Sequence, residues 1–185
     1  MLDDVIKELR SGIDKSIEAL RRDLTRVRTG RAHAGMLDAI RIDYYGVPTP
    51  LQQMANVAVP EPRLITIKPW EKGQVKAIEK AIRESDLNLN PQVDGDLIRI
   101  PIPALTEDRR KEMVKLSRKY GEEAKVAVRK HRRDANEMID TLDQGGDVSG
   151  DDAERAKKKV EDIVAEGIKQ VDTIITAKEK DILEV

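Results

Sequence analysis

The stretch from Thr106 to Leu142 places the strongest constraint on how this chain can fold. No proline follows Pro103, and the stretch has the composition of one uninterrupted helix. At 1.5 Å per residue, a helix of this extent would be about 55 Å long. A compact single-core domain does not hold a helix of that length, so the sequence predicts an elongated helical body.

One side of this predicted helix carries apolar and small residues. Placed at roughly 100° per residue, nine positions fall within one arc and are expected to form a buried seam: Met113, Leu116, Tyr120, Ala124, Ala127, His131, Ala135, Met138 and Leu142. On this apolar arc, His131 is expected to be a seam histidine with its polar atoms satisfied, and not a catalytic group.

A second arc, beside the seam, carries charges of one sign. Its members are Arg110, Lys111, Arg118, Lys125, Arg129 and Arg132, with Glu107 as the only acid and with Val114 and Ile139 as interruptions. A solvated helix face normally mixes both signs, as the third arc of this helix does. We call these six cations the basic row and predict that it forms a polyphosphate-binding surface.

Two further long helices are predicted at the ends of the chain. From Leu2 to Arg28 apolar residues recur at spacings of three and four, and the same rhythm returns after Ser149, where Ser149 and Asp152 resemble a capping box. The first of these helices ends in a group of arginines: Arg21, Arg22, Arg26 and Arg28. These arginines are interpreted either as charges that suit the helix dipole and solvent or as a phosphate-facing group, and the sequence leaves both open.

The segment between the first two helices has a different pattern. Ile40, Ile42 and Tyr44 alternate with polar residues, and short β-branched runs follow at 56–59, 64–67 and 97–100. The range 73–85 is its one helical stretch, and Asp94-Gly95 is a hairpin-turn signal. The expected fold class is therefore α+β: a three-helix bundle of residues 1–29 and 106–185 with a small β/α/β domain, residues 30–105, inserted into it.

Composition excludes several kinds of function. Charged residues make up 37% of the chain and aromatic residues 2%, and cysteine is absent, which removes disulfides and thiolate sites. Neither His33 nor His131 has a metal ligand at helical spacing, and no phosphate-binding P-loop motif occurs. We expect a cytoplasmic protein with no catalytic residue, no metal or other cofactor, no small-molecule substrate and no membrane segment.

Trp70 is a candidate partner contact. It lies between a predicted strand and the predicted helix of the inserted domain, and tryptophan is enriched at binding hot spots. Packing of its ring against Pro69 or against the following helix is an equally good interpretation of the sequence.

Five strings occur in an order that resembles the bacterial ribosome recycling factor family. They are RTGRA at 28–32, YYGVPTPL at 44–51, DLNLNP at 86–91, IRIPIPALTE at 98–107 and VAVRKHRRDAN at 126–136. The resemblance extends from the first helix to the C-terminus. One departure is the Lys130-His131 pair, where the family commonly has Asn and an aliphatic residue.

The resemblance implies an L-shaped protein with a tRNA-like outline, built from a three-helix bundle and a small domain joined by a two-stranded hinge. It implies binding to the post-termination ribosome, where the factor acts with elongation factor G and GTP to split the subunits and release mRNA. The bundle would contact large-subunit ribosomal RNA, and the smaller domain would face elongation factor G and the small subunit. The chain is expected to act as a monomer.

The family's RNA-binding arginines correspond here to Arg110, Arg129 and Arg132. Lys111, Arg118, Lys125, Arg28 and Arg31 extend the predicted RNA surface. The predicted hinge consists of Thr29, Gly30 and Arg31 at one crossing and Pro103, Ala104 and Leu105 at the other. The alternative is a non-enzymatic helical adaptor, which would bind other helices through an exposed seam.

Overall fold

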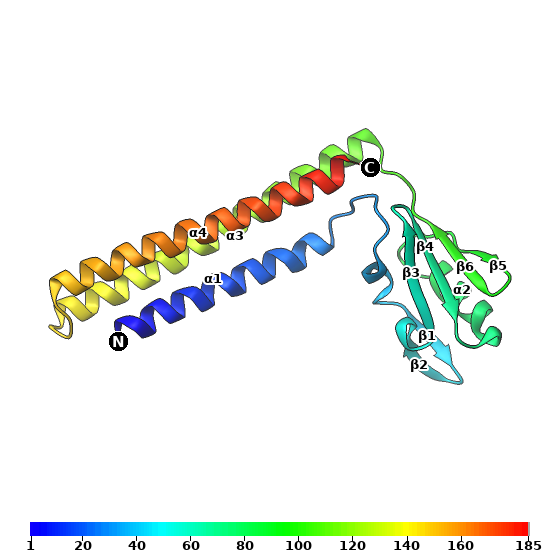
Figure 1. The fold of residues 1–185 in the computed structure, drawn as a ribbon, viewed down its shortest axis with the longest axis horizontal. Helices are drawn as coiled ribbons and strands as arrows, with labels where there is room; N and C mark the ends of the chain where they lie inside the picture. The colour runs from blue at the N-terminus through cyan, green and yellow to red at the C-terminus, as the bar shows by residue number, and fades with distance from the viewer. Residues whose placement is uncertain (185) are drawn as a thin grey trace. The chain divides into compact units, whose positions relative to one another are not determined.

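The computed structural model describes residues 1–184, which divide into two compact units (Figure 1). The helical unit comprises Met1–Thr29 and Glu107–Glu184, and the α/β unit comprises Gly30–Thr106. Val185, the last residue of the predicted bundle, lies outside the described residues. Thr106, the first residue of the predicted second bundle segment, groups with the α/β unit.

Three long helices make up the helical unit. They are α1 (Leu2–Thr25), α3 (Glu107–Gln144) and α4 (Gly150–Leu183), and each packs against the other two (Figure 1). Their apolar stripes form one continuous core, in which Val128, Val160 and Val171 are completely buried. The predicted cap of the third helix is confirmed, because Ser149 Oγ accepts a hydrogen bond from the backbone N–H of Asp152 at 3.1 Å.

The buried face of α3 differs from the predicted seam. Its buried positions are Ser117, Gly121, Ala124, Val128, Ala135 and Ile139. The prediction was wrong for Met138, which is 37% exposed, and for Ile139, which was placed in the basic row but is 0% exposed. Because α3 packs against both α1 and α4, its buried arc is displaced by about 60° toward the basic row.

Each of the three helix–helix contacts includes one glycine at a close approach. A Cβ atom added at Gly12 would lie 2.7 Å from His131 Nδ1, one at Gly121 would lie 2.7 Å from Ile175 Cγ1, and one at Gly167 would lie 2.9 Å from Ile13 Cγ2. These separations are shorter than van der Waals contact allows. The bundle therefore depends on the absence of a side chain at these positions.

His131 is a seam histidine, as predicted. Its ring lies against Gly12, and its Nε2 is 3.2 Å from the hydroxyl oxygen of Ser16. The ring thus joins α3 to α1 through a polar contact at the border of the core.

The α/β unit contains two antiparallel sheets. β1 (Arg41–Tyr44) pairs with β2 (Val47–Pro50), and a four-stranded sheet has the order β3-β4-β6-β5. The strands of the larger sheet are β3 (Ala55–Glu61), β4 (Leu64–Pro69), β5 (Gln92–Asp94) and β6 (Leu97–Pro101). Between β4 and β5 runs α2 (Val75–Arg83), and short 3-10 helices occupy Ala34–Leu37, Leu51–Gln53 and Lys72–Gln74.

The core of this unit lies on one face of the larger sheet. Alternate residues of β4 and β6 form the cross-strand pairs Ile65–Ile100 and Ile67–Ile98, and all four are 0% exposed. Two isoleucines of α2 belong to the same core. The α+β fold class, with a β/α/β segment inserted into a three-helix bundle, is confirmed.

The Asp94-Gly95 hairpin is also confirmed. Asp94 pairs with Leu97, and the turn residue Gly95 has a φ of +60°. The sequence did not predict β2 or β5 as strands, because β2 contains two prolines and β5 is only three residues long.

Two backbone hydrogen bonds hold the chain where it enters and leaves the α/β unit. The N–H of Ala32 donates to the carbonyl oxygen of Pro62 at 2.6 Å, and the N–H of Ile102 donates to that of Arg63 at 2.8 Å. Both segments are thereby fixed to the β3–β4 turn. The predicted hinge residues begin directly outside these two anchors, and Gly30 among them has a φ of +74°.

Candidate nucleic-acid interface

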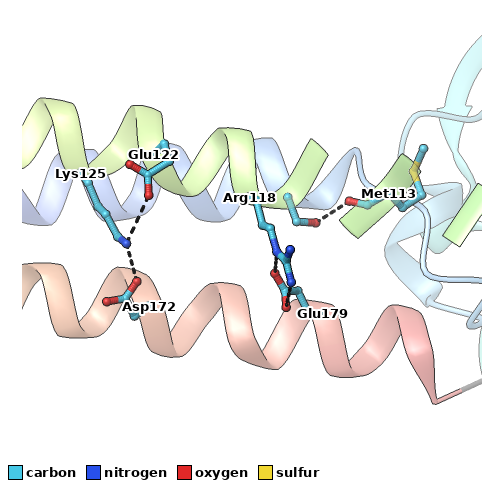
Figure 2. Close-up of polar contacts among 7 residues, drawn as sticks. Met113, Arg118, Glu122, Lys125, Asp172 and Glu179 are labelled. Atoms are coloured by element: carbon cyan, nitrogen blue, oxygen red, sulfur yellow. Dashed lines mark hydrogen bonds and ion pairs between the residues drawn. The ribbon is translucent and has the colours of Figure 1, made fainter. Parts of the chain in front are cut away.

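Arg118 and Lys125 of the basic row point toward α4 (Figure 2). The guanidinium of Arg118 donates to both carboxylate oxygens of Glu179, at 2.6 and 3.2 Å. The ammonium of Lys125 lies 2.6 Å from Asp172 and 3.4 Å from Glu122, and its side chain is only 19% exposed. Hydrogen bonds to Glu179 and to Asp172 raise the pKa of Arg118 and of Lys125.

A third member of the row, Arg132, also has a partner on α4. Its guanidinium lies 3.7 Å from Glu161, and its side chain is 40% exposed. About two turns farther along α3 the charges are exchanged between the helices, since Lys157 of α4 pairs with Asp140 of α3 at 2.5 Å. The acids that balance much of the basic row therefore lie on the neighbouring helix, where the sequence of α3 alone does not reveal them.

The remaining members of the row differ in their surroundings. Arg129 is exposed and has no ion-pair partner among residues 1–184. Lys111 pairs with Glu107 of its own helix at 3.0 Å, in a pair that is largely exposed and therefore weak. Arg110 is half-buried. Of the six cations, Arg129 is the most available to an external phosphate.

The three arginines implied by the resemblance remain on one side of α3. Arg129 and Arg132 are neighbours on the helix surface, and Arg110 lies about 28 Å away along the axis. At 100° per residue the three fall within an arc of about 100°. Arg129 and the half-exposed Arg132 thus lie together on the helix surface, with Arg110 at a distance.

The arginines at the end of α1 are exposed. Arg21, Arg22, Arg26 and Arg28 have no ion-pair partner within residues 1–184, in contrast to the paired cations of α3. A phosphate-facing role for Arg28 therefore stays a prediction. Arg31, which begins the α/β unit, is half-buried.

The described residues contain no group of three His, Asp or Glu side chains that could hold a metal ion. Within residues 1–184, none of the helices combines the length and the apolar composition needed to cross a bilayer.

Aromatic side chains are exposed on the α/β unit. Trp70 is 67% exposed, so packing of its ring against neighbouring residues accounts for little of its surface. The hydroxyl of Tyr44 donates to Glu71 at 2.7 Å, and Tyr45 at the tip of the β1–β2 hairpin is 80% exposed. Sequence reasoning overlooked the two tyrosines as a site, although a Tyr-Gly pair at a hairpin turn was a visible signal.

Comparison with known proteins relates the whole chain to one family. A family model described as "Ribosome recycling factor" matches residues 20–183. A ribosome-recycling factor of Sorangium cellulosum (strain So ce56) is 77% identical over 185 residues, with full coverage of both chains. One from Myxococcus xanthus (strain DK1622) is 53% identical, also over the full length of both.

Solved structures agree with this relationship. A solution structure of a ribosome recycling factor matches with a TM-score of 0.77 and 40% identity, covering 100% of this chain and 98% of its own. A second match has a TM-score of 0.67 and 42% identity and covers 99% of both chains. It is described as models for the T. thermophilus ribosome recycling factor and the E. coli elongation factor G bound to the E. coli post-termination complex.

The bundle with its inserted sheet, the five sequence strings and full-length identities above 50% all point to the same relationship. The chain belongs to the ribosome recycling factor family.

Proposed function

We propose that this chain disassembles the post-termination ribosomal complex. Acting with elongation factor G and GTP, it splits the large from the small subunit and releases mRNA for a new round of translation. The observation that carries this proposal is its 77% identity to a ribosome-recycling factor along its full length. The similar factor bound with elongation factor G to a post-termination complex supports both partners. The chain is a non-enzymatic factor, and its place of action is the bacterial cytoplasm.

In this proposal the helical unit anchors the protein to large-subunit ribosomal RNA. Arg129 and Arg132 make charge-assisted contacts to phosphates, and Arg110 contributes a further contact along the same side of α3. Arg118 and Lys125 have a different task, because their cations are engaged by α4. They fasten the two longest helices together, so that the bundle resists bending when the α/β unit is pushed.

The crossings between the two units serve as the hinge. We assign the hinge movement to residues 29–31 and 103–105, because Ala32 and Ile102, the residues next to them, are hydrogen-bonded to the β3–β4 turn. The positive φ of Gly30 is available to glycine at little cost. This arrangement supports rotation about a short, defined segment rather than bending of the sheet itself.

The adaptor alternative requires an exposed apolar seam. Among the described residues, the apolar stripes of α1, α3 and α4 cover one another in a single core. No observation favours that alternative.

Sedimentation with 70S ribosomes across a salt series, with and without elongation factor G and GTP, tests the proposal. The parent protein should co-sediment in a salt-dependent manner and should convert ribosomes to subunits only when both the factor and GTP are present. A non-hydrolysable GTP analogue is the control. Stable 70S ribosomes under the complete conditions would refute the proposed function.

A further inference from the structure

The α/β unit carries exposed aromatic and apolar side chains that its own core does not use. The chain has three tyrosines, one tryptophan and no phenylalanine, and three of these four aromatic residues are Tyr44, Tyr45 and Trp70. Tyr45 is 80% exposed, Trp70 67% and the nearby Val47 62%. Aromatic residues are scarce in this protein, and two of the four, Tyr45 and Trp70, are exposed on one unit. Tyr44 is partly buried against the core of the same unit.

Tyr45 occupies a backbone conformation that is unfavourable for a bulky residue. Tyr44 pairs with Val47, which leaves Tyr45 and Gly46 as a two-residue turn with φ values of +49° and +85°. Such a turn requires positive φ at both positions and is therefore best formed by Asn-Gly or Asp-Gly. Tyrosine here is strained, and because its ring is exposed it recovers little by burial. Stability of the hairpin does not account for this residue.

The ring of Tyr45 is nevertheless held in place. It meets the ring of Tyr44 edge-on, with centroids 4.7 Å apart and an interplanar angle of 74°. Tyr44 is in turn fixed by its hydrogen bond to Glu71, and Asp43 Oδ1 accepts the N–H of Gly46 at 2.7 Å. An exposed ring with a preset orientation loses little entropy when a partner binds.

The charges beside these rings are negative. Asp43 and Glu71 are both exposed and lie next to Tyr44 in the hydrogen-bonded network. The next cation along the chain, Lys72, is paired with Asp96 at 3.1 Å. Carboxylates repel nucleic-acid phosphates, whereas carboxylates and tyrosine rings together attract guanidinium and ammonium groups.

We infer that the aromatic tip, defined as Asp43, Tyr44, Tyr45, Val47 and Glu71, docks onto a protein surface that presents arginine or lysine. A cationic side chain of the partner stacks on Tyr45 and pairs with a flanking carboxylate, while Val47 contacts the aliphatic part of the same surface. The inference rests on the proposed function, because the partner is met on the ribosome.

The substitution Tyr45→Asn separates binding from folding. It installs the Asn-Gly turn that the hairpin geometry favours, so the melting temperature should stay equal or rise. Loss of the ring should slow subunit splitting about tenfold, the effect of removing one moderate hot-spot contact. Val93→Ser is the control, since Val93 is an exposed apolar residue of the same unit, 44% exposed on β5, outside the tip. A lower melting temperature for Tyr45→Asn, or a splitting rate equal to that of the parent, would overturn the inference.

Cross-linking identifies the class of partner. A benzophenone side chain at position 45 of the full-length protein, irradiated on post-termination ribosomes with elongation factor G, should label a protein at a peptide containing Arg or Lys. Labelling confined to RNA, or no labelling in a mixture that still splits ribosomes, would refute a protein partner. Failure of the parent to split ribosomes would instead refute the proposed function, so the two failures are distinguishable.

Discussion

Replacing Gly167 with alanine should destabilise the helical bundle, although the same change usually stabilises a helix. In an unpacked helix interior, alanine is favoured over glycine by about 0.8–1 kcal/mol. At Gly167, however, the added Cβ would lie 2.9 Å from Ile13 Cγ2 and 3.7 Å from Val128 Cγ1.

The neighbouring side chain cannot easily move away. Ile13 is only 4% exposed, and a β-branched residue in a helix has one strongly preferred rotamer. Overpacking of this kind costs about 1–3 kcal/mol. Subtracting the gain in helix propensity leaves a net loss of up to about 2 kcal/mol in the free energy of unfolding. The melting temperature should fall by up to about 8 °C for a chain of this size.

Urea denaturation followed by far-UV circular dichroism measures the effect. Gly150→Ala is the matched control, because the nearest atom to its added Cβ is 3.9 Å away and its stability should change by less than about 0.5 kcal/mol. Combining Gly167→Ala with Ile13→Ala should cost less than the sum of the two single changes, since the clash is then removed. A Gly167→Ala protein about 1 kcal/mol more stable than its parent would show that helix propensity outweighs the contact.

Three further outcomes are expected. Arg129→Ala should weaken ribosome binding and should reduce the slope of log affinity against log salt concentration by about one. Lys125→Met should leave that slope unchanged, because Asp172 already pairs with the Lys125 ammonium. Equal slopes for the two variants would contradict the proposal that Arg129, and not Lys125, contacts phosphate. Gly30→Ala should lower the free energy of unfolding by about 1 kcal/mol, because alanine is disfavoured at a φ of +74°. It should slow subunit splitting, measured by stopped flow, more than it weakens large-subunit binding, measured by sedimentation. Lys178→Met should stabilise the bundle, because burial lowers the pKa of this α4 ammonium. Because the unfolded chain binds the proton more tightly, the stabilisation should be full below the lowered pKa and should shrink as pH rises from that pKa toward 10.5. Urea titrations at several pH values measure this, and a difference in stability that does not change with pH would contradict it.

Much of the fold was predictable because the signals are local. The three-and-four spacing of apolar residues predicted three long helices, and period-two alternation predicted β1. Short runs rich in β-branched residues predicted β4 and β6, and Asp94-Gly95 predicted the β5–β6 turn. The strings that contain Arg28, Tyr44 and Arg129 indicated the family from the sequence alone. These features depend on residues within a few positions of one another, and a sequence records them directly.

The candidate site was less predictable because its properties depend on residues far apart in the chain. A wheel drawn for α3 alone showed a row of cations but not that Glu179 and Asp172 of α4 engage Arg118 and Lys125. It also misplaced Ile139, since the buried arc of a helix depends on how many partners it has and on which flanks they lie.

The sequence by itself determined the helices, most of the strands and the membership of a family, because each follows from local periodicity or from particular strings. Only the tertiary structure decided which cations of α3 are paired with acids of α4, which glycines permit the helices to approach, and that Tyr45 is strained and exposed. The physical reason is that charge pairing, close packing and backbone strain are set by neighbours in space, and no single segment of the chain contains its own neighbours.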